Sequence, residues 1–299
     1  MAKFLILADT PATGDKERNF QDGNGRYIWH QLYNAGFPVE DFAIEFLFSK
    51  LGEDRWLEIE RKHQPKVVLA MGQQCMENFG IEGKVLKVRG SVFEVKRKDR
   101  TMIVIPTLNF KDIKKPYNLF MDESLEKGFF VAADIRKAVD IYYNGYEPIK
   151  ENFILEPTLK DVETFVEEAV KNKWKLGLDI EATGLNLEYA EIVVIGFAWS
   201  ENDAIVIPFR DKGGSEYWDP ESWNYVRYLL EKLFKECTFI AQNGIGYDIP
   251  LLRYRGWDFP LESYTDDTMI LHHTIDPAQQ HNIGLISSIY GKMPSTKAA

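Results

Sequence analysis

The stretch Leu178-Asp179-Ile180-Glu181-Ala182-Thr183-Gly184-Leu185 decides the fold of the C-terminal half of this chain. Side chains two residues apart on a strand point to the same face of a sheet, so Asp179 and Glu181 are predicted to project together. Two carboxylates side by side on an otherwise apolar strand are costly unless a positive charge neutralises them. A pair of Mg²⁺ or Mn²⁺ ions does so and also creates a hydrolytic site. The alternative is a strand that simply faces solvent.

A second segment carries another acid. It runs from Phe239 to Leu252, where the apolar Phe239-Ile240-Ala241 predicts a buried strand that delivers Asn243 at its end. Asp248 follows at the start of a predicted helix, and a helix N-cap is the structural alternative for it because Pro250 comes soon after. The two segments together are more specific than either alone.

The two segments resemble the first two motifs of the DEDD exonuclease superfamily. The matching residues are Asp179-x-Glu181-x-Thr183-Gly184-Leu185 and Asn243-x4-Asp248, and downstream residues 267–271 and 281–285 resemble the proofreading domain of family A DNA polymerases, with a spacing similar to phage members. The resemblance covers roughly residues 150–294. It implies that Asp179, Glu181 and Asp248 are catalytic metal ligands in a 3′→5′ exonuclease. It also implies that a single-stranded DNA 3′ end binds at Thr183, Gly184, Leu185 and Asn243.

One motif of that family has no counterpart. The family carries a third motif, Tyr-x3-Asp, beyond the helix that matches Ile283–Tyr290, and this sequence has none there. We therefore expect either a fragment of a longer polymerase or a naturally short chain with weak catalysis and a two-metal site that is only partly filled. If a fourth ligand exists within the 299 residues, Asp266, Asp267 and Asp276 are the first suspects.

The pattern of apolar residues predicts two α/β domains. A break at Asn144-Gly145-Tyr146-Glu147-Pro148 separates residues 1–147 from residues 148–299. In the first half, alternation of strands and helices predicts a three-layer domain. In the second, a hairpin-led mixed sheet with interleaved helices is consistent with a ribonuclease-H-like fold. The predicted strands are Phe4–Ala8, Val67–Met71, Val92–Val95, Met102–Pro106, Leu176–Ile180, Ile192–Trp199, Ala204–Phe209 and Thr238–Ala241. The predicted helices are Tyr27–Ala35, Gln73–Phe79, Glu123–Tyr143, Asp161–Trp174, Trp223–Phe234, Ile249–Tyr254, Asp267–Thr274 and Ile283–Tyr290.

Four segments of the first domain resemble the uracil-DNA glycosylase superfamily. They are Ala8-Asp9-Thr10-Pro11-Ala12, Asn19-Phe20 with the glycines after it, Pro65–Gly72 followed by Arg89-Gly90, and Ile105–Phe110. The resemblance implies that the ring of Phe20 stacks on a base. Asn109 stands where the family has its catalytic histidine, so we expect a domain that binds DNA without cleaving a base.

A basic segment in the same domain offers a path for a phosphate backbone. It contains Lys96, Arg97 and Lys98, with Lys84, Lys87, Arg89 and Arg100 nearby. The alternative is a solvated hairpin with mixed charges.

Composition narrows the class of protein. Of the 299 residues, 45% are hydrophobic and 27% charged, which is typical of globular domains, and no apolar run is long enough for a membrane span. Residues 151–299 carry 13 Lys and Arg against 24 Asp and Glu, so the acidic excess lies in the half with the predicted metal ligands. Two cysteines, Cys75 and Cys237, favour a reducing cytoplasm over a disulfide framework. In a viral protein this is the host cytoplasm.

The leading interpretation is the N-terminal part of a bacteriophage family A DNA polymerase. A glycosylase-like domain would precede a proofreading exonuclease, with the polymerase module as its partner in the full-length protein. Two alternatives stay open: a non-catalytic module for DNA binding or replication assembly, and an active uracil-DNA glycosylase.

Overall fold

The computed structural model describes residues 4–10, 26–37, 42–47, 52–97, 100–109 and 123–292. The chain divides into two compact units, Met1–Pro148 with Gly284–Ala299, and Ile149–Ile283. The first division falls within the predicted break. The sequence, in contrast, assigns residues 284–299 to the second domain, whereas the described residues 284–292 group with the first unit.

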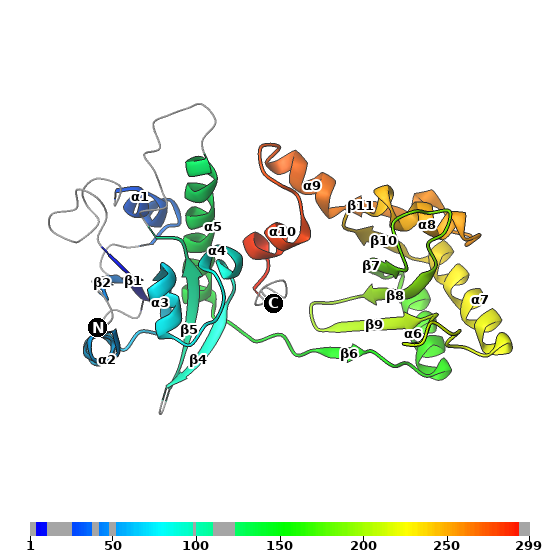
Figure 1. The fold of residues 1–299 in the computed structure, drawn as a ribbon, viewed down its shortest axis with the longest axis horizontal. Helices are drawn as coiled ribbons and strands as arrows, with labels where there is room; N and C mark the ends of the chain where they lie inside the picture. The colour runs from blue at the N-terminus through cyan, green and yellow to red at the C-terminus, as the bar shows by residue number, and fades with distance from the viewer. Residues whose placement is uncertain are drawn as a thin grey trace. The chain divides into compact units, whose positions relative to one another are not determined.

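The first unit contains a sheet of five described strands in the order β2-β1-β3-β5-β4 (Figure 1). β1, β2, β3 and β5 run parallel, and β4 pairs antiparallel with β5. The strands are β1 (Phe4–Ala8), β2 (Phe42–Phe46), β3 (Val67–Met71), β4 (Phe93–Arg97) and β5 (Arg100–Thr107). The helices are α1 (Arg26–Asn34), α2 (Gly52–His63), α3 (Gln73–Asn78), α4 (Val85–Val88), α5 (Glu123–Asn144) and α10 (Ile283–Tyr290).

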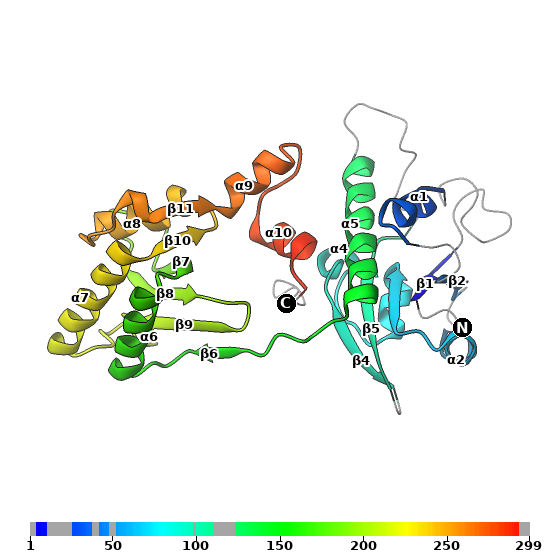
Figure 2. The ribbon, with the colours of Figure 1, turned by 180° about the vertical axis from the view of Figure 1, so that it is seen from behind.

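Helices cover both faces of this sheet. Every side chain of β1 is buried, as expected for a parallel strand with a core on each side. Phe4 and Ile6 join a cluster with residues of α1 and α5, while Leu5 and Leu7 join another with residues of α2 and α3. Figures 1 and 2 both show α1 beside α5. The first unit is thus the three-layer domain that the alternation of strands and helices predicts.

The second unit is built on a mixed sheet in the order β11-β10-β7-β8-β9-β6. β7, β8 and β9 form an antiparallel meander, and β10 and β11 then add in parallel beside β7. The strands are β6 (Asn152–Ile154), β7 (Lys175–Ala182), β8 (Ile192–Ala198), β9 (Asp203–Pro208), β10 (Thr238–Ala241) and β11 (Tyr264–Asp267). The helices are α6 (Leu159–Asn172), α7 (Pro220–Glu236), α8 (Asp248–Tyr254) and α9 (Thr268–Ile275). This arrangement is the ribonuclease-H-like α/β fold predicted for this half.

Local sequence signals set the two long helices of the second unit. Thr158 and Asp161 form a capping box at the start of α6, and Asp219 caps α7 just before Pro220. The apolar faces of both helices join the buried side chains of the sheet in one core. Figure 2 shows α6 and α7 side by side, as does Figure 1.

Strand β7 shows how the sheet positions the site. Leu178 and Ile180 are buried in the core that includes α6 and α7, whereas Asp179 and Glu181 are exposed. The period of two therefore places both acids on the face opposite the core, as predicted.

The structure contains elements that the sequence pattern does not predict, among them β2, α2, β6 and β11. β6 is a short edge strand with all three residues exposed, so it lacks the buried side chains that make a strand recognisable. β11 contains two acids and forms because it pairs with β10. Within the described residues, no helix is long and apolar enough to cross a membrane.

Candidate metal and active site

Asp248 lies beside strand β7 and the charge of Asp179, although it is 68 residues from Ile180 in the chain. It is 6% exposed, and the backbone N–H of Ile180 donates to its Oδ1 over 3.0 Å. Burial, and after it the negative charge of Asp179, raises the pKa of Asp248 to about 6. Tyr247 holds the N-cap position of α8, so the N-cap alternative for Asp248 does not describe its contacts. A carboxyl that is buried next to a second carboxylate is costly to ionise.

Glu181, the third predicted metal ligand, lies near Tyr247. The pKa of the Tyr247 phenol is raised mainly by burial, and to a lesser extent by the negative charges of Asp248 and Glu181. Among the residues described, no three His, Cys, Asp or Glu side chains lie close enough together to hold a metal ion. The structure therefore brings Asp179 and Asp248 together, while Glu181 does not form a three-carboxylate group with them.

The residues at this position fit a hard divalent cation in their chemistry. Carboxylate oxygens are the ligands that Mg²⁺ and Mn²⁺ prefer, and Asp248 is buried beside the negative charge of Asp179. In such a site the cation would offset the cost of burying Asp248 in its charged form.

The predicted substrate-contacting residues lie on the loops that follow β7 and β10. Thr183, Gly184 and Leu185 are exposed, and Leu185 is 85% exposed, so it is free to contact a ligand. The Tyr247 hydroxyl donates a hydrogen bond to the carbonyl of Gly184 and so ties this loop to the start of α8. Asn243 is exposed at the end of β10 in the left-handed region, with φ +58°.

Asp267 is one of the three acids that the sequence offers as a possible fourth metal ligand. Its Oδ1 accepts from the backbone N–H groups of Asn243 (2.9 Å) and Met269 (2.8 Å), and its Oδ2 accepts from the Tyr264 hydroxyl (2.6 Å). It caps α9, and its charge contributes to the raised pKa of Asp248. These donors hold Asp267 as an anchor between β10 and α9. The sequence feature that indicates this capping role is the position of Asp267 directly before a predicted helix.

The other two suspects for a fourth ligand are engaged differently. Asp266 forms an ion pair with Lys175, and Asp276 accepts from the backbone N–H of Ala278 at 3.3 Å. Neither acid contributes to the raised pKa of Asp248.

In the first unit, three of the segments that resemble a glycosylase meet at Gly72. A Cβ atom at Gly72 would lie 2.2 Å from Oδ2 of Asp9 and 3.0 Å from Nδ2 of Asn109, so only glycine fits there. The Asp9 carboxylate accepts from the backbone N–H of Cys75 at 2.7 Å. Burial raises the pKa of the Cys75 thiol, with Asp9 adding to the shift, so this cysteine is an inert core residue. Phe20 lies outside the described residues.

The basic segment is only partly available to a phosphate backbone. Lys96 is exposed on β4, while Arg97 donates to the carbonyl of Asn78 at 3.2 Å, and Lys98 lies outside the described residues. Arg89 is buried and pairs with Asp134 through two hydrogen bonds, so it does not belong to any basic surface. These residues are close in sequence, but they do not all contribute to one basic surface.

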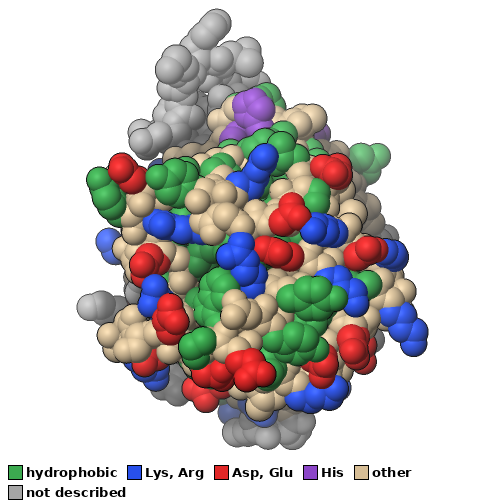
Figure 3. Space-filling view, turned by 90° about the vertical axis from the view of Figure 1, so that its right-hand side faces the viewer, with side chains coloured by type: hydrophobic (Ala, Val, Ile, Leu, Met, Phe, Trp, Pro, Cys, Tyr) green, Lys and Arg blue, Asp and Glu red, His purple; other side chains and the backbone are tan. Residues whose placement is uncertain are grey.

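Surface charge is mixed rather than segregated. Figure 3 shows one face of the molecule on which Lys and Arg side chains alternate with Asp and Glu side chains. In the second unit, ion pairs such as Lys173–Glu236 and Lys235–Asp258 neutralise part of the acidic excess.

Comparisons with known proteins give distant likenesses. No protein-family model and no curated protein matches the chain. Among solved structures, it aligns with the catalytic core of RRP6 from Trypanosoma brucei over 48% of its length at 10% identity and a TM-score of 0.36, and spans 36% of that chain. It aligns with the Aedes aegypti Nibbler EXO domain over 49% at 14% identity (TM-score 0.35, 72% of that chain). It aligns with Brucella melitensis NrnC with bound Mg²⁺ over 51% at 18% identity (TM-score 0.33, 67% of that chain). Likenesses of this size carry no argument about activity.

Proposed function

We propose that the second unit is a metal-dependent 3′→5′ exonuclease domain. The observation that carries this proposal is the buried Asp248, held by the N–H of Ile180 beside Asp179, with its pKa raised to about 6. Burying one carboxyl beside the negative charge of another is costly for a purely structural role. It is expected where cations bind.

Each residue of the site has a proposed part. Asp179, Glu181 and Asp248 hold Mg²⁺ or Mn²⁺, with Glu181 moving closer when an ion is present. When bound, such an ion activates water and stabilises the leaving oxygen of a phosphodiester. The exposed loop residues Thr183–Leu185 and Asn243 contact the last nucleotides of a single-stranded 3′ end.

The wider context is also a proposal. We place this nuclease as the proofreading part of a phage-type family A DNA polymerase that acts in the host cytoplasm beside its polymerase module. The first unit then binds or positions DNA as a glycosylase-like domain without excising bases. The position of Asn109 against Gly72 and near Asp9 supports this, because a neutral amide cannot supply the charge that stabilises a departing base anion.

The test is a time course on 5′-labelled single-stranded DNA with Mn²⁺. Wild type should shorten the strand stepwise from its 3′ end, and Asp179→Ala should slow this by ~100-fold or more because a ligand is lost. Glu262→Gln, which removes an exposed acid outside the site, is the matched control and should behave like wild type. If wild type in excess over DNA does not shorten the strand when metal is present, the nuclease proposal is wrong.

A second candidate function has one observation in its favour. The described residues do not form a three-ligand metal group, which fits a DNA-binding module without catalysis. Strand binding by wild type in a gel-shift assay, without any shortening of the strand, would favour this candidate.

A further inference from the structure

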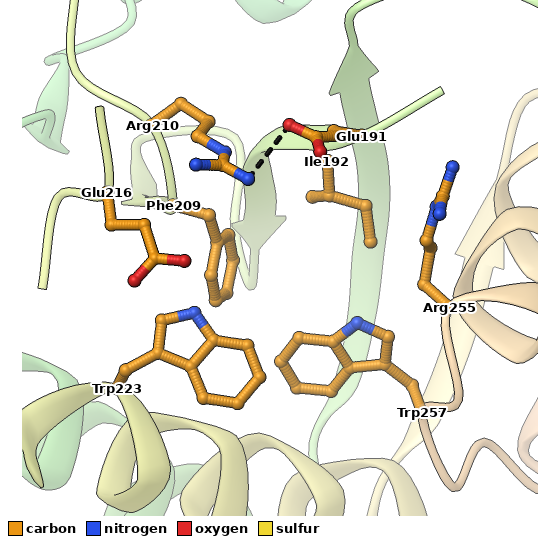
Figure 4. A pocket seen from close by; sticks show the side chains of 8 residues that line it. All are labelled: Glu191, Ile192, Phe209, Arg210, Glu216, Trp223, Arg255 and Trp257. Atoms are coloured by element: carbon orange, nitrogen blue, oxygen red, sulfur yellow. Dashed lines mark ion pairs between the residues drawn. The ribbon is translucent and has the colours of Figure 1, made fainter. Parts of the chain in front are cut away.

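A pocket of about 180 Å³ opens on the second unit and has no part in the carboxylate site. Figure 4 shows the rings of Trp223 and Trp257 side by side at its floor, with Phe209 above them. The two indole centroids are 6.1 Å apart, and Phe209 meets Trp257 edge-on at 5.5 Å. Across the rim, Arg210 forms an ion pair with Glu191 at 2.8 Å. The pocket therefore combines an aromatic floor with a rim that both donates and accepts hydrogen bonds.

The pocket is connected to the candidate active site by two elements. Glu191 and Thr183 are joined by two hydrogen bonds: the Glu191 N–H donates to the side-chain Oγ1 of Thr183 (2.9 Å), and the Glu191 carbonyl accepts from the Thr183 N–H (3.0 Å). The loop between them thus starts at the proposed substrate contacts and ends at the pocket rim.

Helix α8 makes the second connection. It begins at Asp248, and Arg255 at its C-cap lines the pocket. Seven helical residues span about 10 Å at 1.5 Å per residue, so the pocket lies within reach of a few nucleotides from Asp248. Arg255 also donates to the carbonyls of Ala190 (2.6 Å) and Glu188 (3.1 Å), which fixes the loop against the helix.

We propose that this pocket binds one unpaired base of the strand whose 3′ end lies at Asp179 and Asp248. The proposal rests on the proposed exonuclease function and names a second contact for its substrate. A base is flat and apolar on its faces, so it stacks on indole rings whatever its identity. Its edge carries donors and acceptors, which the Arg210 guanidinium and the Glu216 carboxylate on the rim can meet.

The charged groups that line the pocket balance, with the carboxylates of Glu191 and Glu216 beside the guanidinium groups of Arg210 and Arg255. The guanidinium of Arg227 already lies over both indoles, with its Cζ atom 5.6 Å from Trp223 and 5.3 Å from Trp257. A neutral aromatic ligand therefore suits a lining in which two acids offset two arginines.

The test is a scan with abasic sites, made in EDTA so that no strand is cut. Oligothymidylates of equal length carry one abasic residue at successive distances from the 3′ end, and affinity is measured by fluorescence anisotropy. Wild type should lose ~10-fold in affinity when the missing base is the one that enters the pocket, and little at neighbouring positions, because stacking of that base is lost. In Trp223→Leu the scan should be flat, with the intact strand bound as weakly as the abasic one.

Three more variants test whether the loss depends on the pocket. Arg210→Ala changes only the rim and should reduce the position-dependent loss while the fold is kept, and Trp223→Phe should retain part of it. Tyr228→Ala removes an exposed ring on the same helix that does not line the pocket, and should leave the scan unchanged.

The outcomes separate the two proposals. A flat scan in wild type, or the same position-dependent loss in Trp223→Leu, overturns the base pocket even if the protein degrades DNA. A position-dependent loss that Trp223→Leu abolishes supports the pocket even if no strand is ever shortened, in which case only the nuclease proposal fails. Absence of any binding to single strands overturns both.

Discussion

Replacing Asp248 by Asn should stabilise the metal-free protein while it removes the proposed activity. The pKa of Asp248 rises from 3.8 to about 6 because the side chain is buried and faces Asp179. An acid with a raised pKa in the folded state favours folding while it is protonated. This advantage is lost as pH rises from about 3.8 to about 6, because the folded protein binds the proton that the unfolded chain has already released.

The magnitude follows from the size of the shift. A change of about 2 pKa units at ~1.4 kcal/mol each is about 3 kcal/mol of lost stability above pH 6. Asn is neutral at every pH and its carbonyl can still accept from the Ile180 N–H, so Asp248→Asn should avoid this loss. For a unit of this size the difference in melting temperature is roughly 6–12 °C.

The assay is thermal unfolding in EDTA at half-unit steps from pH 4 to pH 8. The advantage of Asp248→Asn over wild type should be small at pH 4, grow to about pH 6 and stay constant above it. Glu262→Gln removes an exposed acid and should show no such growth. If Asp248→Asn melts below wild type at pH 7 in EDTA, or if the difference does not change with pH, the electrostatic account of the site is wrong.

Three further predictions test the two units. Millimolar Mg²⁺ or Mn²⁺ should raise the melting temperature of wild type, measured by scanning fluorimetry, because an ion that binds the folded state stabilises it by mass action. Asp179→Ala should lose most of that rise. Equal rises in the two proteins would show that Asp179 is not a metal ligand. The protein should release no uracil from single- or double-stranded DNA, since Asn109 is neutral; alkali-labile sites that disappear in Asp9→Ala would show the opposite. Lys137 donates to the carbonyls of Gly90 (2.7 Å), Ser288 (2.6 Å) and Gly291 (2.5 Å), so Lys137→Met should speed amide exchange in 284–292 at least ~10-fold, as carbonyls at the end of α10 lose their donor. Unchanged exchange by mass spectrometry would show that this lysine does not hold the segment.

The sequence by itself determined the local features of this protein. A period of two put Asp179 and Glu181 on one face of β7, since alternation along a strand needs no information from elsewhere in the chain. Runs of apolar residues located β1 and β3 at their observed bounds, and a helical period with a closing Asn located α5. The ribonuclease-H-like arrangement followed from the order of these elements.

Tertiary structure decided what depends on contacts between distant segments. The hydrogen bond from Ile180 to Asp248 joins residues 68 positions apart. Burial, with the charges of Asp179 and Asp267, raises the pKa of Asp248, although the Ile180 N–H opposes that shift. Arg89 looked like part of a basic surface, but its pairing with Asp134 across 45 residues buries it. Desolvation and pairing are properties of a position in space, whereas periodicity is a property of the chain, so charge and pKa at a site could not be predicted from the sequence alone.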